Sequence, residues 1–161
     1  MISAKVVGKA DDLGELVKEI NTASWDESNE MVEFEVEALA AYLDHQDTVF
    51  VVCHDRAEGR RTFLGMASAR LELKPYGGER WLYVDEIDVC TDQRQKGAGT
   101  VMMRKLIEVA TEAGCESMWL ATETDNDAAN ALYRSLDPDD VAPIIGYTFE
   151  IAELNGGPPA G

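Results

Sequence analysis

The stretch RWLYVDEIDVCTDQRQKGAGTVMMRKLIEVATEAG, residues 80–114, holds three kinds of sequence in a fixed order. Residues 80–90 are rich in apolar, aromatic and β-branched side chains, which is typical of a strand. The polar segment that follows contains Gly97 and Gly99, and residues 101–114 carry apolar side chains at helical spacing. The stretch therefore predicts a strand, a glycine turn and a helix, which form the first part of a strand–helix–strand unit.

The flanking sequence predicts the remaining elements of one sheet. Strand-like runs and a hairpin turn precede residue 80, and the strand after the helix is expected to pair parallel with residues 80–90. The expected strands are residues 4–8, 47–55, 62–73, 80–90, 117–122 and 144–154, and the expected helices are residues 11–23, 31–44, 101–114 and 128–136. This order predicts an α/β fold of the α+β type, with a mixed, largely antiparallel central sheet flanked by helices.

We expect a single domain over residues 1–154 and a flexible C-terminal tail over residues 155–161. No apolar run approaches the roughly 20 residues that a membrane span needs. The N-terminus lacks the long apolar core of a signal peptide, so a cytoplasmic protein is expected. The three cysteines are far apart and form no CxxC pair, which favours reduced thiols and argues against a metal site.

The charge of the chain narrows the choice of partner. Its net charge is −17, from 31 acidic and 14 basic residues, and no Lys or Arg occurs between Lys18 and Arg56. Nucleic acid is a poor partner for such a surface, because phosphates require basic side chains. A cationic small molecule is a good one. Adaptation to high salt or simple solubility would produce the same acidity, so these sources stay open.

The glycine turn predicts an anion site. A helix N-terminus exposes unpaired N–H groups with a partial positive charge, and glycine lets the backbone approach a ligand closely. Arg94 and Lys96 add two cations just before Gly97. The turn matches neither the phosphate loop that ends in GKS or GKT nor the GxGxxG fingerprint. The alternative is a tight turn that requires glycine only for its shape.

In its context, this turn resembles that of the GNAT superfamily of acyl-CoA-dependent N-acetyltransferases. The resemblance runs from the strand end Ile87-Asp88-Val89 through Arg94-x-x-Gly97-x-Gly99 to the long helix. A second match, WLATETDNDAANALYRSL, looks like the next strand, loop and short helix of the superfamily, so residues 81–136 are covered in all. The resemblance implies that acetyl-CoA is the cofactor, bound between splayed strands. Its pyrophosphate would lie on the amides of the turn, and its pantetheine arm would pair with the strand edge at residues 87–89.

The resemblance also assigns individual residues. Cofactor contacts are implied for Ile87, Asp88, Val89, Arg94, Gln95, Lys96, Gly97, Ala98, Gly99, Thr100, Asn126 and Tyr133. The N–H of Val89 would polarise the thioester carbonyl, and Tyr133 would protonate the departing thiolate. The alternative for Tyr133 is a packing role on a short helix.

An acceptor amine must lose a proton, and a carboxylate beside the reaction centre can bind the ammonium and take that proton. Glu86 and Asp88 lie two apart on one strand and therefore share a face unless a bulge intervenes. The segment Tyr83–Val89 is similar to Tyr-Ile-Tyr-Asp-Leu-Ala-Val of the aminoglycoside 3-N-acetyltransferases, which places Glu86 on their catalytic aspartate. The departures are Glu in place of Asp and a different loop TETDND, residues 122–127.

Further acids extend this candidate acceptor site. The ending TFEI resembles the ending Phe-Asp-Ile of that subgroup and assigns Glu150, and Glu123 matches an acid in the preceding loop. The residues expected to bind the acceptor are Asp26, Glu27, Glu30, Glu86, Asp88, Glu123 and Glu150. The alternative for all of them is a solvated polar surface.

Together these features predict an acetyl-CoA-dependent enzyme that acetylates an amino group of an aminoglycoside, expected to be the 3-amino group, and so confers antibiotic resistance. The proposed transfer is direct, within a ternary complex, with Glu86 as base and Tyr133 as acid. A homodimer is expected from the resemblance. Two alternatives stay open: transfer to another cationic amine, such as a polyamine or a protein amine, and a module that binds acyl-CoA without catalysis.

Overall fold

The computed structural model describes residues 1–151, which form two compact units that divide after Ala121. The expectation of a single domain over residues 1–154 stays a prediction, and the expected tail, residues 155–161, lies outside the described residues.

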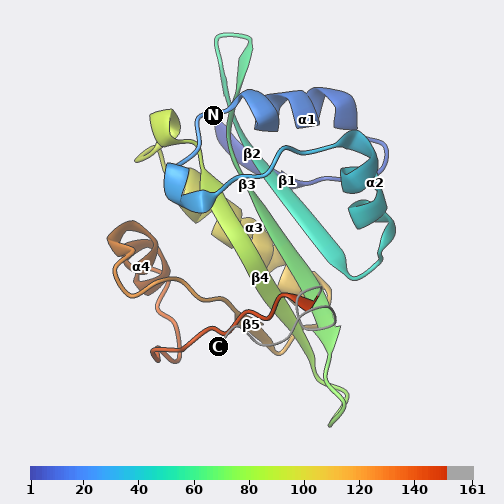
Figure 1. The fold of residues 1–161 in the computed structure, drawn as a ribbon, viewed down its shortest axis with the longest axis vertical. Helices are drawn as coiled ribbons and strands as arrows, with labels where there is room; N and C mark the ends of the chain where they lie inside the picture. The colour runs from blue at the N-terminus through green and yellow to red at the C-terminus, as the bar shows by residue number, and fades with distance from the viewer. Residues whose placement is uncertain (152–161) are drawn as a thin grey trace, which may run out of the picture. The chain divides into compact units, whose positions relative to one another are not determined.

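The first unit is built on a five-stranded sheet in the order β1-β2-β3-β4-β5 (Figure 1). Its strands are β1 (Ile2–Val6), β2 (Thr48–Ala57), β3 (Arg60–Leu73), β4 (Arg80–Val89) and β5 (Ser117–Trp119). The first three pairings are antiparallel, and β4 pairs parallel with β5. The predicted α/β fold with a mixed, largely antiparallel sheet is confirmed. The parallel pairing follows from the crossover through a helix, which returns the chain to the same end of the sheet.

Helices cover both faces of this sheet. In Figure 1, α1 (Leu13–Thr22) and α2 (Val36–Asp44) lie in front of the strands, and α3 (Ala98–Glu112) lies behind them. Asp12 caps α1 by accepting a hydrogen bond from the N–H of Glu15, which satisfies one of the free amides of the first turn. None of the helices in residues 1–151 combines the length and the apolar character needed to cross a bilayer.

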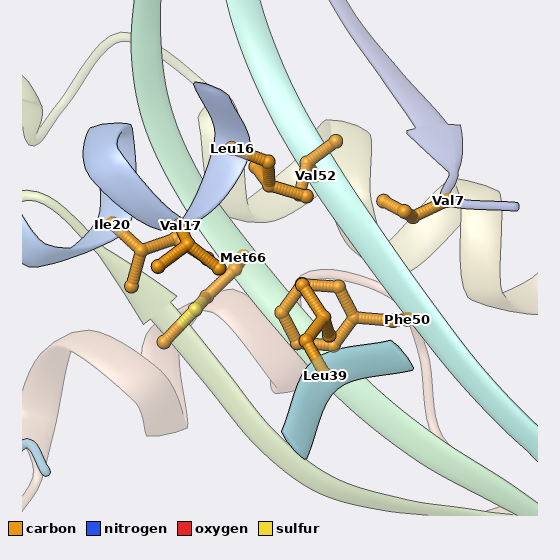
Figure 2. Close-up of a cluster of buried hydrophobic side chains, with 8 residues drawn as sticks. All are labelled: Val7, Leu16, Val17, Ile20, Leu39, Phe50, Val52 and Met66. Atoms are coloured by element: carbon orange, nitrogen blue, oxygen red, sulfur yellow. The ribbon is translucent and has the colours of Figure 1, made fainter. Parts of the chain in front are cut away.

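A compact apolar cluster joins α1 and α2 to the sheet. It consists of Val7, Leu16, Val17, Ile20, Leu39, Phe50, Val52 and Met66 (Figure 2). Leu16, Val17 and Ile20 follow the helical spacing that places their side chains on one face of α1. On the opposite face of the sheet, α3 buries Met102, Met103, Leu106 and Ala110. The sheet is therefore held from both sides, and β4 is a rigid support for side chains near its end.

Two short helical turns connect these elements to one another. The η1 turn (Glu27–Asn29) lies in the segment between α1 and α2, and the η2 turn (Thr91–Gln93) lies between β4 and α3. The helix expected over residues 31–44 begins only at Val36, because residues 31–35 alternate charged and apolar side chains and adopt no regular structure. This segment ends beside α1, where Asn21 exchanges two hydrogen bonds with the backbone of Phe34.

The second unit, which begins at Thr122, contains the helix α4 (Asp127–Arg134), capped by the side chain of Asn126. The strand expected over residues 144–154 is wrong for its described part, since residues 144–150 form no strand. Alternation of apolar residues does not by itself hold a strand, because the backbone of a strand also needs hydrogen-bond partners on another segment. The described part of this unit contains no strand, and Ile145 and Tyr147 stay 78% exposed.

Candidate active site

The turn between β4 and α3 has the shape of an anion cradle. Gln95 and Gly97 adopt left-handed conformations, with φ of 64° and 87°. Alternation of left- and right-handed residues turns successive N–H groups toward one side of the chain. The amides of Ala98, Gly99 and Thr100 donate no hydrogen bond to any residue in the described range 1–151. They are the free amides of the first turn of α3, so this turn has donors to offer a ligand.

The side chains around the turn add positive charge. Arg94 and Lys96 are exposed, and Lys96 donates a hydrogen bond of 2.7 Å to the side-chain oxygen of Gln93. A Cβ atom built on Gly97 would meet no other atom within 4 Å, so open space adjoins the cradle. Free amides, two cations and open space fit a pyrophosphate, as the sequence predicts.

One edge of β4 is open next to this turn. β5 pairs only with Trp81–Tyr83, so no described strand pairs with residues 84–89 on the β5 side. The other edge of this segment is hydrogen-bonded to β3. An unpaired edge with free N–H and C=O groups can accept an extended, amide-bearing ligand as an added strand. The strands are thus splayed at the predicted cofactor site.

A bulge in β4 decides where the carboxylates lie. Ser68 of β3 pairs with Glu86 and Ala69 pairs with Val84, so Asp85 is the extra residue. The bulge precedes Glu86 and leaves the spacing to Asp88 intact, which puts both side chains on one face of β4. Glu86 is exposed, whereas Asp88 is partly buried.

The segment between α1 and α2 reaches this face of β4 and the glycine turn. Nδ2 of Asn29 donates a hydrogen bond of 2.7 Å to Oδ1 of Asp88, and Arg94 forms an ion pair of 2.7 Å with Asp26. The N–H of Thr91 donates to the carbonyl of Ser24 at 2.8 Å. The structure thus brings one acid of the early loop, Asp26, to the candidate cofactor site, while Glu27 and Glu30 are exposed on the same turn.

Two carboxyl groups here have shifted pKa values in opposite directions. Burial, followed by the charge of Glu86, raises the pKa of Asp88 to about 6. Hydrogen bonds from Ser28 and then Arg94 lower the pKa of Asp26 to about 2. Asp88 therefore titrates close to neutral pH, whereas Asp26 stays ionised as the partner of Arg94.

Asn29 is a residue that sequence reasoning missed. It is an uncharged side chain in a polar break, 59 residues from Asp88, and no local pattern connects the two. Only the folded course of the segment between α1 and α2 reveals the contact.

The other predicted site residues lie in the second unit. Asn126 caps α4 by accepting from the N–H of Ala129 at 3.1 Å. The carbonyl of Glu123 accepts one hydrogen bond from the backbone N–H of Asn126 and one from the side-chain Nδ2 of Asn130. Tyr133 lies in the last turn of α4, and Glu150 is exposed. These placements make Asn126 a structural residue of its own helix, whatever it also binds.

Two further observations concern other kinds of site. A hollow of about 280 Å³ between β1 and α3 contains none of the predicted site residues; Ala4, Val101, Arg104, Lys105 and Glu108 line it. No group of three or more His, Cys, Asp or Glu side chains within residues 1–151 is arranged to hold a metal ion.

With this geometry, comparison with known proteins is decisive for the family. A model of the acetyltransferase (GNAT) family matches residues 11–137. The chain belongs to this family. The match contains the glycine turn, the open edge of β4 and α4, so the GNAT region includes every element described above except β1 and the last described residues.

Relatives of this GNAT chain differ in their names. It is 32% identical over 68 residues to the thialysine N-epsilon-acetyltransferase of Bos taurus. The aligned region covers 42% of this chain and 40% of the relative. The chain therefore matches less than half the length of that curated relative. An aminoglycoside acetyltransferase from an uncultured soil metagenomic sample, solved in complex with sisomicin, has a TM-score of 0.76 at 18% identity. That alignment covers 92% of this chain and 95% of the other.

A third similar structure is AAC(6')-Iy in complex with the bisubstrate analogue CoA-S-monomethyl-acetylneamine. Its TM-score is 0.66 at 15% identity, with 93% of this chain and 99% of that chain covered. At such identities the likeness concerns the fold.

Proposed function

We propose that this GNAT chain is an acetyl-CoA-dependent N-acetyltransferase for a cationic small-molecule amine, with an aminoglycoside amino group as the leading acceptor. The observation that carries the proposal is the adjacency of an anion cradle, an open strand edge and carboxylates at one end of β4. Donor and acceptor have opposite charges, so a site for both needs cationic and anionic groups side by side. The turn with Arg94 and the face with Glu86 provide this combination.

The donor is acetyl-CoA, which supplies the acetyl group as a reactive thioester. The amides of the first turn of α3 and the side chains of Arg94 and Lys96 would hold its pyrophosphate. The open edge of residues 84–89 would pair with the pantetheine amides, and the N–H of Val89 would polarise the thioester carbonyl. On β4, the donor would use backbone groups and leave the side chains of Glu86 and Asp88 to the acceptor.

The acceptor would be captured by the acidic face of β4. Each ammonium–carboxylate pair near the surface provides about 1 to 4 kcal/mol of gross Coulomb energy at about 4 Å, before the cost of desolvation. Several such pairs give affinity for a polyamine-like sugar and little for a neutral amine. A carboxylate of β4 then takes the proton that the ammonium must lose, and Tyr133 is proposed to protonate the leaving thiolate.

The names of the relatives support acetyl transfer to amines in general. Aminoglycoside enzymes share the fold over nearly the whole chain, which supports the proposed acceptor, and the 3-amino position rests on the resemblance of residues 83–89 alone. The bovine relative is named for thialysine, an amino acid with a side-chain amine. This favours a lysine-like or polyamine acceptor as the second candidate.

A substrate panel separates these candidates. Thiol release from acetyl-CoA is measured with gentamicin-like aminoglycosides, spermidine, thialysine and a lysine-rich peptide. The proposal predicts the highest kcat/KM for an aminoglycoside. A clear preference for thialysine or spermidine would replace the acceptor, and tight acetyl-CoA binding without turnover on any amine would favour a module that binds without catalysis.

A further inference from the structure

Two carboxylates on the same face of β4 have different surroundings. Glu86 is exposed, and its side chain forms no hydrogen bond or ion pair with another residue in the described part of the chain. Asp88 is partly buried, and its Oδ1 accepts the hydrogen bond from Asn29 at 2.7 Å. The first carboxylate is free to follow a mobile cation, whereas the second is held in one orientation.

Asn29 is itself held in place by several contacts. It is the last residue of η1, whose first turn is capped by Asp26 through the N–H and the hydroxyl of Ser28 at 3.1 and 2.7 Å. Asp26 is in turn paired with Arg94, and the carbonyl of Ser24 accepts two hydrogen bonds from Thr91. The donor to Asp88 is therefore part of a segment whose first residues are fixed to Thr91 and Arg94, which directly follow β4.

The backbone of Asp88 is also positioned by close packing. A Cβ atom at Gly65 of β3 would collide with the carbonyl oxygen of Asp88, so only glycine allows this approach of the two strands. Asp88 directly precedes Val89, the last residue of the open edge. The backbone that carries the Asp88 carboxylate is therefore fixed beside the edge on which the donor would lie.

One oxygen of this carboxylate stays available. Asn29 is the only described partner of the Asp88 side chain, and it contacts Oδ1. Every side-chain oxygen within residues 1–151 that is sealed from solvent has a hydrogen-bond partner. Oδ2 of Asp88 has no such partner, so it cannot be sealed from solvent. Oδ2 of Asp88 therefore remains accessible and can accept a proton from an amine or from a water that bridges to it.

We infer that Asp88 is the general base of the acetyl transfer, that Asn29 is its positioning residue, and that Glu86 binds the acceptor ammonium without taking its proton. This inference rests on the proposed function and sharpens it. Oδ2 of Asp88 takes one proton from the ammonium, and the amine nitrogen attacks the thioester carbonyl. The C–N bond forms and the C–S bond breaks, and the second proton of the nitrogen passes to the departing sulfur, which leaves as the free thiol.

The surroundings of Asp88 support a base that works near neutral pH. Burial and the charge of Glu86 raise its pKa to about 6, which matches the ideal of a catalytic pKa close to the working pH. Opposite Asp88, β3 contributes the uncharged Met66. The η1 turn contributes the uncharged Asn29, and the charged residue that caps this turn, Asp26, is paired with Arg94.

Steady-state kinetics on the best amine of the panel test the assignment. Asp88→Asn should lower kcat by about 10² to 10⁴-fold, because the base is lost. Glu86→Gln should raise the KM for the amine and leave kcat within a few-fold. Asn29→Ala should lower kcat about fivefold with little change in KM. It should also move the acidic limb of the kcat pH profile to higher pH, because the hydrogen bond from Asn29 stabilises the ionised carboxylate and its removal raises the pKa of Asp88.

Gln46→Ala is the matched control, since it removes a side-chain amide from an exposed position in the turn between α2 and β2, away from the candidate site. It should leave kcat and the pH profile unchanged. The inference is overturned if Asp88→Asn keeps kcat while Glu86→Gln abolishes it, or if Gln46→Ala shifts the profile as much as Asn29→Ala.

A readout without turnover keeps this test independent of the proposed function. NMR titration of the carboxyl carbons, with the Asp88→Asn variant for assignment, should place the pKa of Asp88 near 6 and move it upward in Asn29→Ala but not in Gln46→Ala. A titration of Asp88 in the ordinary carboxyl range, indifferent to Asn29, contradicts the inference. Failure of the wild-type protein to acetylate any amine contradicts the proposed function instead.

Discussion

Asp88 combines a proposed chemical role with a cost in stability. Its folded pKa of about 6 lies above the ordinary value of 3.8, so the folded protein binds this proton more tightly than the unfolded chain does. The resulting stabilisation is complete below about pH 4 and is lost as the pH rises through about 6. At neutral pH the ionised carboxylate therefore weakens the fold.

Asp88→Asn should consequently raise the free energy of unfolding at pH 8 by about 1 kcal/mol, after allowance for the solvent that still reaches this carboxyl. The gain should vanish at pH 4, where both proteins carry a neutral side chain. Urea denaturation at the two pH values measures this difference, with Asp139→Asn, at an exposed position, as the charge-matched control. If Asp88→Asn is less stable than the wild type at pH 8, the ionised carboxylate does not destabilise the folded protein, and this prediction is wrong.

Gly65 gives a second prediction at this scale. Gly65→Ala should destabilise the protein by about 1 to 3 kcal/mol, because the new methyl group has to displace the β4 backbone at Asp88. The matched control is Gly14→Ala in α1, where the added Cβ would meet Asp12 at an ordinary 3.5 Å and helix propensity improves. Denaturant titration should show opposite signs for the two variants; equal effects would contradict the close approach.

Among the elements, the first turn of α3 makes the sharpest prediction. Gly97→Ala places a Cβ in a left-handed conformation with φ of 87°, so the turn must rearrange or bear about 1 to 2 kcal/mol of strain. Affinity for coenzyme A should fall about tenfold, because the free amides move. Gly59→Ala in the β2–β3 hairpin is the matched control, since its φ is 76° and its Cβ also meets open space.

Calorimetric titration with coenzyme A distinguishes the two glycines. Both variants should lose similar stability in denaturant, and only Gly97→Ala should lose affinity. Equal affinity in all three proteins would mean that the turn does not hold the pyrophosphate.

The elements that sequence predicts well are those with local signals. The helix α1 has Asp12 as its cap and apolar residues at helical spacing, and α3 begins where the glycine turn ends. The strand predicted over residues 144–154 had only its own alternation as a signal, and residues 144–150 form no strand. A strand depends on a second segment far away in the sequence, which a single run of residues does not contain.

The candidate site divides in the same way. The glycine turn and the carboxylates of β4 are contiguous in sequence and were predicted. The bulge at Asp85 depends on the register with β3, and the contact of Asn29 with Asp88 spans 59 residues, so both needed the folded chain.

For the whole molecule, the net charge of −17 predicts opposite salt effects on the two substrates. Salt screens attraction between an acidic surface and a polycationic amine, so raising NaCl from 50 to 500 mM should raise the KM for the amine several-fold. The KM for acetyl-CoA, an anion, should stay level or fall. An acceptor with a single amino group is the control and should respond weakly. If KM for the polycation does not depend on salt, the acidity serves another purpose.

Hydrogen–deuterium exchange with and without coenzyme A tests most directly whether the nucleotide lies on the glycine turn and along the open edge of β4. Slower exchange is predicted in the peptides that contain residues 84–89 and 98–100, because a bound pyrophosphate and pantetheine arm would occupy those amides. The account is contradicted if coenzyme A binds with protection elsewhere and leaves both segments exchanging as in the free protein.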